Sequence, residues 1–293
     1  MNVRRPAPAD AAAVAELIDA YERAYAVPET TADDMRDEWR DLDLDRDAWI
    51  FEVDGRLAGY ASVRGHGTEL LFVDGYVHPG LTGHGVGARI VELTEARARE
   101  RGAARLHNGT LQRDEGGRAL FEASGYHYVR SFFRMGIELD REPPEPTVPG
   151  GLRLEPYDPA GARAFHAAIE EAFEDHWEHE PRSFETWQHR VRDVDATLWF
   201  VVRDGEEIAG AIQNEARRYG AGWIGAVATR RAWRGRGVAQ ALLLASMREF
   251  HRRGERRAAL AVDAANPTGA VRVYERVGMH VVFQADIFEK PLG

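Results

Sequence analysis

The sequence has no cysteine, a single lysine (Lys290) and no long apolar run. The absence of cysteine excludes disulfide bridges, thiolate metal ligands and cysteine nucleophiles, and it fits a reducing compartment. No apolar run approaches the roughly 18 residues that a membrane span needs, and the N-terminal stretch lacks the apolar core of a secretory signal. These absences predict a cytoplasmic protein with no membrane partner.

The rest of the composition is that of ordinary folded domains, with 44% hydrophobic and 29% charged residues among 293. This length accommodates one large domain or two domains of about 100–200 residues each. The net charge of −10 argues against general nucleic-acid binding, which requires a basic surface. We therefore expect no nucleic-acid partner, and the composition predicts no particular oligomeric state.

A proline-rich segment divides the chain into two similar halves. The segment DREPPEPTVPGG, which begins at Asp140, has no apolar periodicity and reads as a linker, because proline restricts its neighbours to extended backbone. Matching stretches recur on both sides of it at separations of 150 to 153 residues. The matched glycines are Gly55 with Gly205, Gly85 with Gly237, and Gly125 with Gly278. The sequence thus predicts an internal duplication, with domains over 1–140 and 152–293 and a linker over 141–151.

The second half alternates between strand and helix patterns. A hairpin is expected around Asp204-Gly205, followed by a strand over 221–229, an amphipathic helix over 238–251, a strand over 256–264 and a strand over 280–290. A helix over 267–277 is expected between the last two strands, with Asn266 as its N-cap and Gly278 at its C-terminal end. This order predicts an α/β (α+β) fold, a mixed sheet with helices on its faces.

An arginine- and glycine-rich loop, RRAWRGRGVAQALL from Arg230, joins the strand ending near Thr229 to the helix starting near Val238. A helix start offers unpaired N–H groups and a positive dipole end, and glycines let a ligand approach the backbone. Such a place suits a phosphate, although the loop has neither the Walker A pattern nor the dinucleotide fingerprint. Taken alone, the loop leaves three alternatives open: a phosphate cradle, a solvated turn, or a nucleic-acid patch.

Two motifs resemble those of the GNAT superfamily of acyl-CoA-dependent N-acetyltransferases. The stretch Arg234-x-x-Gly237-x-Ala239 resembles the first signature of that family, and DAANPTGAVRVYERVGM resembles the second. Both motifs recur at equivalent places in the first half. The resemblance implies two tandem GNAT-like domains. Each would have a mostly antiparallel central sheet, one parallel strand pair that splays apart, and helices on both faces.

The resemblance also implies a site in the second half. The backbone of Val227 and Thr229 would pair with the pantetheine arm of acetyl-CoA, and the Val227 N–H would polarise the thioester carbonyl. The pyrophosphate would lie on the amides of the loop, helped by two arginines. The implied cofactor-binding residues are Val227, Thr229, Arg234, Gly235, Arg236, Gly237, Val238, Ala239 and Asn266. No metal is needed for this chemistry.

Tyr274 is the implied general acid, because it matches the family tyrosine that protonates the departing thiolate. Its alternative role is that of an aromatic anchor in the core. The general base stays open among Glu215, His176, His179 and an ordered water. The acidic stretch 169–187, which carries both histidines, either attracts a cationic amine or simply forms a solvated helix end.

The first half departs from the family pattern. Thr82 replaces the signature arginine, Arg113 stands in the place of Asn266, and Phe121 replaces Tyr274, although Gly83, Gly85 and Gly87 are kept. Glu69 is expected near the place of the carboxylate that some relatives carry on a strand. We therefore expect catalysis in 152–293 alone, as acetyl transfer from acetyl-CoA to the primary amine of a small molecule. The alternative is a non-catalytic CoA-binding or protein-interaction module on the same scaffold.

Overall fold

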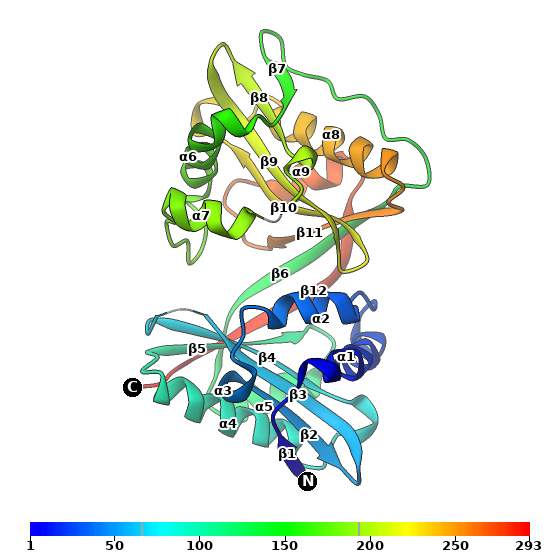
Figure 1. Cartoon of the computed structure of the whole chain (residues 1–293), viewed down its shortest axis with the longest axis vertical. Coiled ribbons are helices and arrows are strands. Elements are labelled where there is room, and N and C mark those ends of the chain that lie inside the picture. Colours follow the sequence, from blue (N-terminus) through cyan, green and yellow to red (C-terminus); the bar gives the residue numbers. More distant parts are fainter. Residues whose placement is uncertain (66, 193) are drawn as a thin grey trace. The chain divides into compact units, whose positions relative to one another are not determined.

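The computed structural model describes residues 1–65, 67–192 and 194–293 (Figure 1). The chain forms two compact units. Unit 1 contains residues 1–133 together with 282–293, and unit 2 contains residues 134–281. Each unit has a mixed sheet with helices packed against it, so the predicted fold class is confirmed.

Unit 1 is built on five consecutive strands and one strand from the far end of the sequence. The strands lie in the order β1 (Asn2–Arg4), β2 (Ala48–Val53), β3 (Arg56–Arg64), β4 (Leu70–Val77), β5 (Arg105–Leu111) and β12 (His280–Pro291). Only the β4–β5 pair is parallel among the pairings described for this unit. The helices are α1 (Ala11–Tyr25), α2 (Ala32–Trp39), α3 (Leu44–Asp47), α4 (Val86–Glu100) and α5 (Glu115–Ala123).

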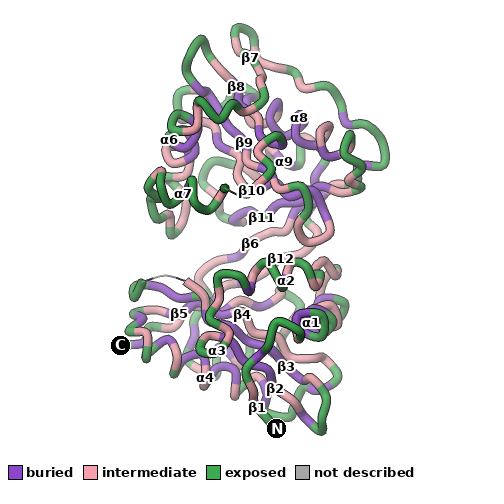
Figure 2. The backbone as a smooth tube through the Cα atoms, in the orientation of Figure 1, coloured by how far each residue is buried: buried purple, intermediate pink, exposed green. Residues whose placement is uncertain are grey.

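Two separate apolar clusters cover the two faces of the unit 1 sheet. Alternate residues of a strand point to opposite faces, and β2 accordingly sends Phe51 into one cluster and Ile50 into the other. The first cluster includes Val86 and Ile90 of α4, and the second includes Met35 of α2. Figure 2 shows the buried strands between more exposed helices. Helices on both faces of the sheet are therefore confirmed for this unit.

Unit 2 repeats the strand order of unit 1. Its strands are β7 (Arg153–Pro156), β8 (Phe200–Asp204), β9 (Glu207–Arg218), β10 (Ala221–Thr229) and β11 (Arg257–Asp263), followed by β6 (His127–Glu138). Its helices are α6 (Ala162–Phe173), α7 (Phe184–Val191), α8 (Val238–Arg252) and α9 (Ala270–Arg276). Both α6 and α8 pack against β9 and β10.

The two units also contain short 3₁₀ turns. These lie at Pro8–Asp10, Pro79–Leu81, Pro159–Gly161, Ala196–Leu198 and Arg231–Trp233.

Most local expectations for unit 2 are confirmed. The hairpin turns at Gly205, where φ is 57°, and β10 has the expected bounds. The last helix is shorter than expected, because α9 starts at Ala270 with Gly269 in the left-handed region as its N-cap. Asn266 is therefore not the N-cap. Its side chain instead accepts a hydrogen bond from the Thr268 N–H at 2.9 Å and shapes the turn before the helix.

The end of α9 agrees with the sequence. Gly278 has φ 94°, and the Gly278 N–H donates to the Glu275 carbonyl at 2.9 Å. The Met279 N–H donates to the Tyr274 carbonyl at 3.1 Å. These two bonds form the Schellman arrangement that satisfies the last carbonyls of a helix, and only glycine adopts the required φ without strain.

The two repeats exchange their last strands between the units. β6 follows the first repeat but enters unit 2 at Arg134, where it lies beside β11 and buries Met135. β12 follows the second repeat but enters unit 1 at Val282 and pairs antiparallel with β5, from Ala285 opposite Leu111 to Pro291 opposite Arg105. The boundaries of the compact units therefore differ from the predicted domain boundaries. The predicted boundaries describe the repeat in the sequence, and they stay a prediction.

Candidate active site

The parallel strands β10 and β11 separate at their carboxyl ends. Their register consists of Gly222 opposite Ala258 and Trp223 opposite Ala259, whereas β10 continues to Thr229 and β11 to Asp263. On its other edge β10 stays paired with β9 as far as Thr229, after an irregularity between Ile224 and Ala226. Among the described residues, the backbone of β10 that faces the splay thus has no strand partner, and it can accept an extended ligand.

Val227 and Thr229 both lie on this separated part of β10. Val227 pairs with Ile212 and Thr229 with Gly210, both on β9. The buried Thr229 hydroxyl oxygen has no hydrogen-bond partner among the described residues. The structure thus brings the two residues expected along the pantetheine arm to the edge where the sheet opens.

The loop after β10 exposes the start of α8. Gly235 and Gly237 have φ values of 75° and 91°, and Gly237 is the N-cap of α8 without a side-chain cap. A Cβ atom on Gly235 would meet nothing within 4 Å, so its conformation rather than crowding requires glycine there. No described side chain therefore caps the first N–H groups of α8, at Val238 and Ala239, and they can bind an anion.

Close packing fixes this helix start against the sheet. A Cβ atom on Gly210 of β9 would lie 2.5 Å from Val238 Cγ1 and 2.8 Å from the Ala228 carbonyl oxygen. Only glycine lets Val238, itself 1% exposed, approach the strand so closely. Gly210 thereby sets the position of the loop amides relative to β10.

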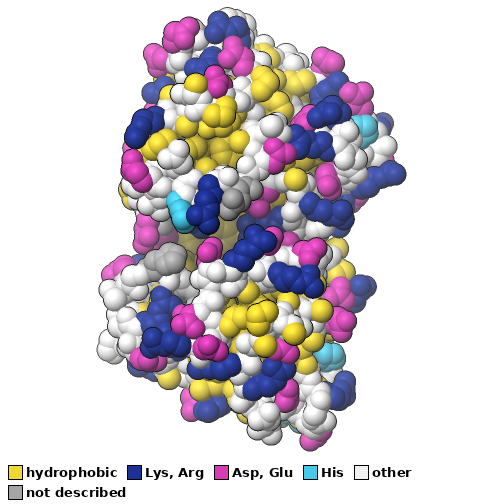
Figure 3. Space-filling view, in the orientation of Figure 1, with side chains coloured by type: hydrophobic (Ala, Val, Ile, Leu, Met, Phe, Trp, Pro, Cys, Tyr) yellow, Lys and Arg dark blue, Asp and Glu magenta, His cyan; other side chains and the backbone are white. Residues whose placement is uncertain are grey.

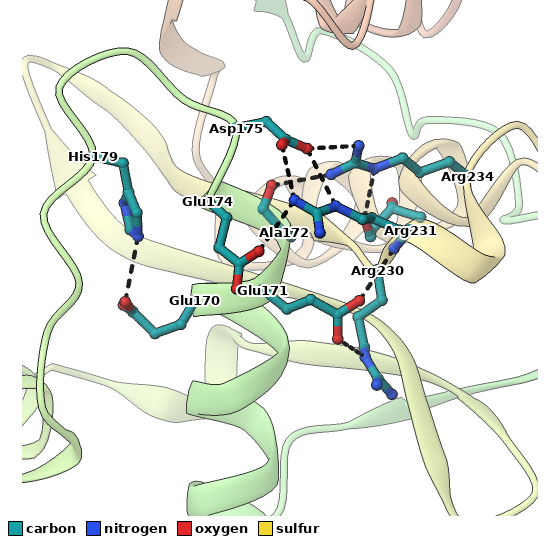
Figure 4. A network of polar contacts seen from close by, with 10 residues as sticks. Glu170, Glu171, Ala172, Glu174, Asp175, His179, Arg230, Arg231 and Arg234 are labelled. Carbon is teal, nitrogen blue, oxygen red and sulfur yellow. Dashed lines mark hydrogen bonds and ion pairs between the residues drawn. The ribbon is translucent and has the colours of Figure 1, made fainter.

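Three loop arginines point toward the end of α6 (Figure 4). Together with their acidic partners they form what we call the arginine clamp. Its contacts are Arg230 to Glu171 at 2.6 Å, Arg231 to Asp175 at 2.8 Å and to Glu174 at 3.1 Å, and Arg234 to Asp175 at 3.1 Å. Arg234 also donates to the Ala172 carbonyl at 3.3 Å and the Thr229 carbonyl at 3.4 Å. Its expected role as a pyrophosphate ligand stays a prediction.

Arg236 differs from the other loop arginines. It lies between the two left-handed glycines, its side chain is exposed, and it makes no ion pair within the described ranges. Its charge is therefore available beside the uncapped start of α8.

Tyr274 lies on α9 and is only 9% exposed. Its hydroxyl makes no hydrogen bond with any described residue. Burial raises the pKa of Tyr274 to about 12, so the phenol keeps its proton at neutral pH. That is the protonation state which a general acid needs.

The candidate bases differ in their surroundings. His176 is half-buried, and burial is the main cause that lowers the pKa of its imidazole below the usual value, followed by the charge of His179. Such an imidazole is neutral at pH 7 and can accept a proton. His179 Nε2 lies 3.5 Å from Glu170 Oε2.

Glu215 lies far along the sheet from Val227. It stands opposite Trp223, where β10 and β11 still pair, and it forms an ion pair with Arg218 at 3.6 Å. At about 3.3 Å per residue, Trp223 and Val227 are about 13 Å apart along the strand. This placement weakens Glu215 as the base.

The aromatic residues of the acidic stretch are partly explained by packing. Trp187 is 5% exposed, and its ring lies near those of Phe165, Phe184 and Trp199. It is therefore a core residue, whereas the acids at the end of α6 belong to the arginine clamp. The clue in the sequence was the match of an acidic helix end with an arginine-rich loop, and sequence reasoning missed it.

Unit 1 keeps the backbone of this site but not its side chains. β4 pairs with β5 over four residue pairs, Gly85 is the left-handed N-cap of α4, and Gly83 also has a positive φ. Phe121 is 8% exposed and lies beside Tyr126 and Phe288 as a core residue.

The expected place of Glu69 is wrong. Glu69 precedes the first residue of β4 and pairs with Arg105 at 3.3 Å, so it lies at the opposite end of the strand from the glycine loop. The carboxylate on β4 is Asp74, which pairs with Arg64. The signal in the sequence that could have identified Asp74 was an aspartate inside an apolar strand pattern.

Outside this site, charged and metal-ligating side chains form few clusters among the described residues. On the face drawn in Figure 3, basic and acidic side chains are interspersed. Across the described ranges, no group of three or more His, Cys, Asp or Glu residues could hold a metal ion. None of the described helices is both long and apolar enough to cross a membrane.

Known proteins resemble this chain over two thirds of its length or more. Mycothiol acetyltransferase of Catenulispora acidiphila is 29% identical over 94% of this chain and 94% of its own length. The enzyme of the same name from Thermobispora bispora is 29% identical over 69% of this chain and 70% of its own.

Solved structures show the same architecture. A GCN5-related N-acetyltransferase from Sphaerobacter thermophilus has a TM-score of 0.91 and 35% identity, covering 99% of this chain and 95% of that one. A tandem GNAT protein from the clavulanic acid biosynthesis pathway has a TM-score of 0.78, with 100% and 98% coverage, and at 18% identity it shows the fold alone. The acetyltransferase (GNAT) family matches residues 14–126 and again 162–279. The chain therefore belongs to the GNAT acetyltransferase family and contains two copies of its domain.

Proposed function

We propose that unit 2 transfers an acetyl group from acetyl-CoA to the primary amine of a small molecule. The observation that carries the proposal is the open edge of β10 beside the uncapped, glycine-flanked start of α8. An extended amide-bearing arm matches the strand edge, and a pyrophosphate matches the helix start. The amides of residues 235–239 and the free charge of Arg236 support this binding mode.

The chemistry needs a neutral amine, a polarised carbonyl and a proton for the leaving sulfur. In the proposed reaction the amine nitrogen attacks the thioester carbon, and the Val227 N–H stabilises the developing oxyanion. The carbon–sulfur bond then breaks as the amide forms. The nitrogen loses a proton to a base, for which His176 and water are the candidates, and Tyr274 donates a proton to the thiolate.

The acceptor is proposed to belong to the class that mycothiol acetyltransferases use. This rests on relatives that match nearly end to end at 29% identity. Structures with the same fold also include a glucosamine N-acetyltransferase region, at 16% identity. The small-molecule class is therefore the proposal, and the mycothiol-type acceptor is its first candidate.

Thiol release from acetyl-CoA tests the proposal. The panel should contain the amine precursor of mycothiol, amino sugars, amino acids and polyamines, with acetyl-CoA binding measured separately by calorimetry. We expect amine-dependent CoA release with at least one of these compounds. Binding without release for every amine would favour the alternative, a non-catalytic CoA-binding module, for which Phe121 in unit 1 is a precedent. Absence of binding would contradict both.

A further inference from the structure

The arginine clamp ties the CoA loop to the segment that follows α6. Asp175 receives two guanidinium groups, from Arg231 at 2.8 Å and from Arg234 at 3.1 Å. Hydrogen bonding and charge from these arginines hold the pKa of the Asp175 carboxyl below its usual value. Residues 174–183, which we call the acceptor segment, are thus anchored at their first turn (Figure 4).

The acceptor segment lies close to the ends of both separated strands. His176 is within electrostatic reach of Asp263, the last residue of β11, and of Arg234, which contacts the last carbonyl of β10. The segment therefore borders the open end of the splay, where an amine must approach a thioester held along β10.

Unit 1 has neither half of the clamp. Equivalent helices share their burial pattern at a separation of 151 residues, and the equivalent loops are separated by 152. The positions equivalent to the three arginines hold His78, Pro79 and Thr82, and those equivalent to the three acids hold Ala20, Arg23 and Ala24. Basic and acidic partners are present together in one repeat and absent together in the other.

Unit 1 fixes its corresponding segment by another means. The Glu22 carboxylate of α1 accepts hydrogen bonds from the Glu29 N–H at 2.7 Å, the Thr30 N–H at 3.1 Å and the Thr30 hydroxyl at 2.6 Å. That segment is therefore held by its own helix, as Glu170 of α6 also holds the Arg182 N–H at 3.0 Å in unit 2, but among the described residues no ion pair links it to the glycine loop.

We propose that Arg234 is a positioning residue for the acceptor segment, and that the pyrophosphate is held by the loop amides and Arg236 instead. This inference rests on the proposed function and changes the role that the family signature implies for Arg234. Three of the five Arg234 donors are already engaged by a carboxylate and two carbonyls, so only two are left for a phosphate. Arg236 makes no such contacts with the described residues, so it serves as the matched comparison.

Two matched variants of the full chain separate these roles. Arg234→Gln should raise amide hydrogen exchange in residues 174–183 by about five- to tenfold and leave the acetyl-CoA Kd within about twofold. Arg236→Gln should leave exchange there unchanged and raise the acetyl-CoA Kd about tenfold, because it removes a charge-assisted contact. Asp175→Asn should behave like Arg234→Gln, since it breaks the same link from the other side.

Equal weakening of acetyl-CoA binding by the two arginine variants would overturn the proposal. Unchanged exchange in Arg234→Gln and Asp175→Asn would overturn it as well. These readouts need no acceptor, so they decide this inference even if the amine panel fails.

Once an amine is found, the kinetics give a further test. Arg234→Gln should raise KM for the amine about tenfold with kcat reduced less, whereas Arg234→Lys should recover most of the loss because it keeps the charge beside Asp175. A rise in KM for acetyl-CoA alone would contradict a positioning role.

Discussion

Units 1 and 2 share a backbone and differ in the side chains that are proposed to carry out the chemistry. In both, a left-handed glycine starts a helix, and a strand glycine admits the first valine of that helix: Gly59 meets Val86 in unit 1, and Gly210 meets Val238 in unit 2. Only unit 2 has a tyrosine on its last helix and arginines paired with the end of its first helix. The comparison teaches that the backbone geometry of this fold persists when the proposed catalytic and clamp side chains are replaced.

The largest expected effect comes from the exchanged strand. Phe288 lies on the last strand of the second repeat but is fully buried in the core of unit 1, beside Phe121. Phe288→Ala should destabilise unit 1 by about 3–5 kcal/mol through lost burial and a cavity. Denaturant unfolding monitored by hydrogen exchange should show faster exchange within residues 1–133.

The matched control is Phe250→Ala, since Phe250 is 0% exposed and lies on α8 of unit 2. It should raise exchange within residues 134–281 instead. If Phe288→Ala affected unit 2 first, the assignment of β12 to unit 1 would fail.

The next largest effect concerns Tyr274, the residue that most clearly distinguishes unit 2 from unit 1. Tyr274→Phe should lower kcat about 100-fold with little change in acetyl-CoA binding, because general acid catalysis contributes about 10²–10⁴-fold. Because the pKa of Tyr274 is about 12, its deprotonation should cause no loss of rate between pH 7 and 10. An unchanged kcat would remove Tyr274 from the mechanism. Phe121→Tyr is the reciprocal control and should give unit 1 no activity.

A smaller effect should follow from crowding the shared glycines. Gly210→Ala places a Cβ atom 2.5 Å from Val238 Cγ1, and Gly59→Ala places one 2.6 Å from Val86 Cγ1. Each should cost about 1–3 kcal/mol of stability, as overpacking does. Only Gly210→Ala should also weaken acetyl-CoA binding measured by calorimetry. Equal weakening by both variants would mean that unit 1 contributes to binding.

The smallest effect is the pH dependence of His176. Its folded pKa lies below the unfolded value of about 6.5, so the unfolded chain binds more protons as the pH falls. The folded state should therefore lose stability below about pH 6.5, and His176→Gln should lose less between pH 7.5 and 5.5. The position equivalent to His176 in unit 1 is Tyr25, and Tyr25→Phe should leave this window unchanged. Identical pH profiles for wild type and His176→Gln would contradict the lowered pKa.

Local patterns predicted the elements that place the site. β10, the start of α8 and the end of α9 could be predicted, because alternation, amphipathic spacing and left-handed glycines act over a few residues. The start of α9 could not be predicted, because both Asn266-Pro267 and Gly269 are suited to begin a helix. In the structure the Asn266 side chain stabilises a turn, and the helix begins after Gly269. The pairing of Arg234 with Asp175 is also beyond local pattern, because it links residues 59 apart in the sequence.

The strand exchange was equally hidden. The stretch 280–290 reads as the end of its own repeat, and nothing in an alternating pattern says which sheet a strand will join. That choice depends on the edge that each strand meets after its preceding helix.

The exchange sets an order on synthesis. Residues 1–133 of unit 1 are made before unit 2, yet strand β12 of unit 1 is made only after all of residues 134–281. Translation proceeds at about 5–20 residues per second, so β5 has an open edge for about 7–30 seconds while residues 134–281 are made. An open edge is where another chain can pair, so a nascent unit 1 is exposed to mispairing until the second repeat has been made.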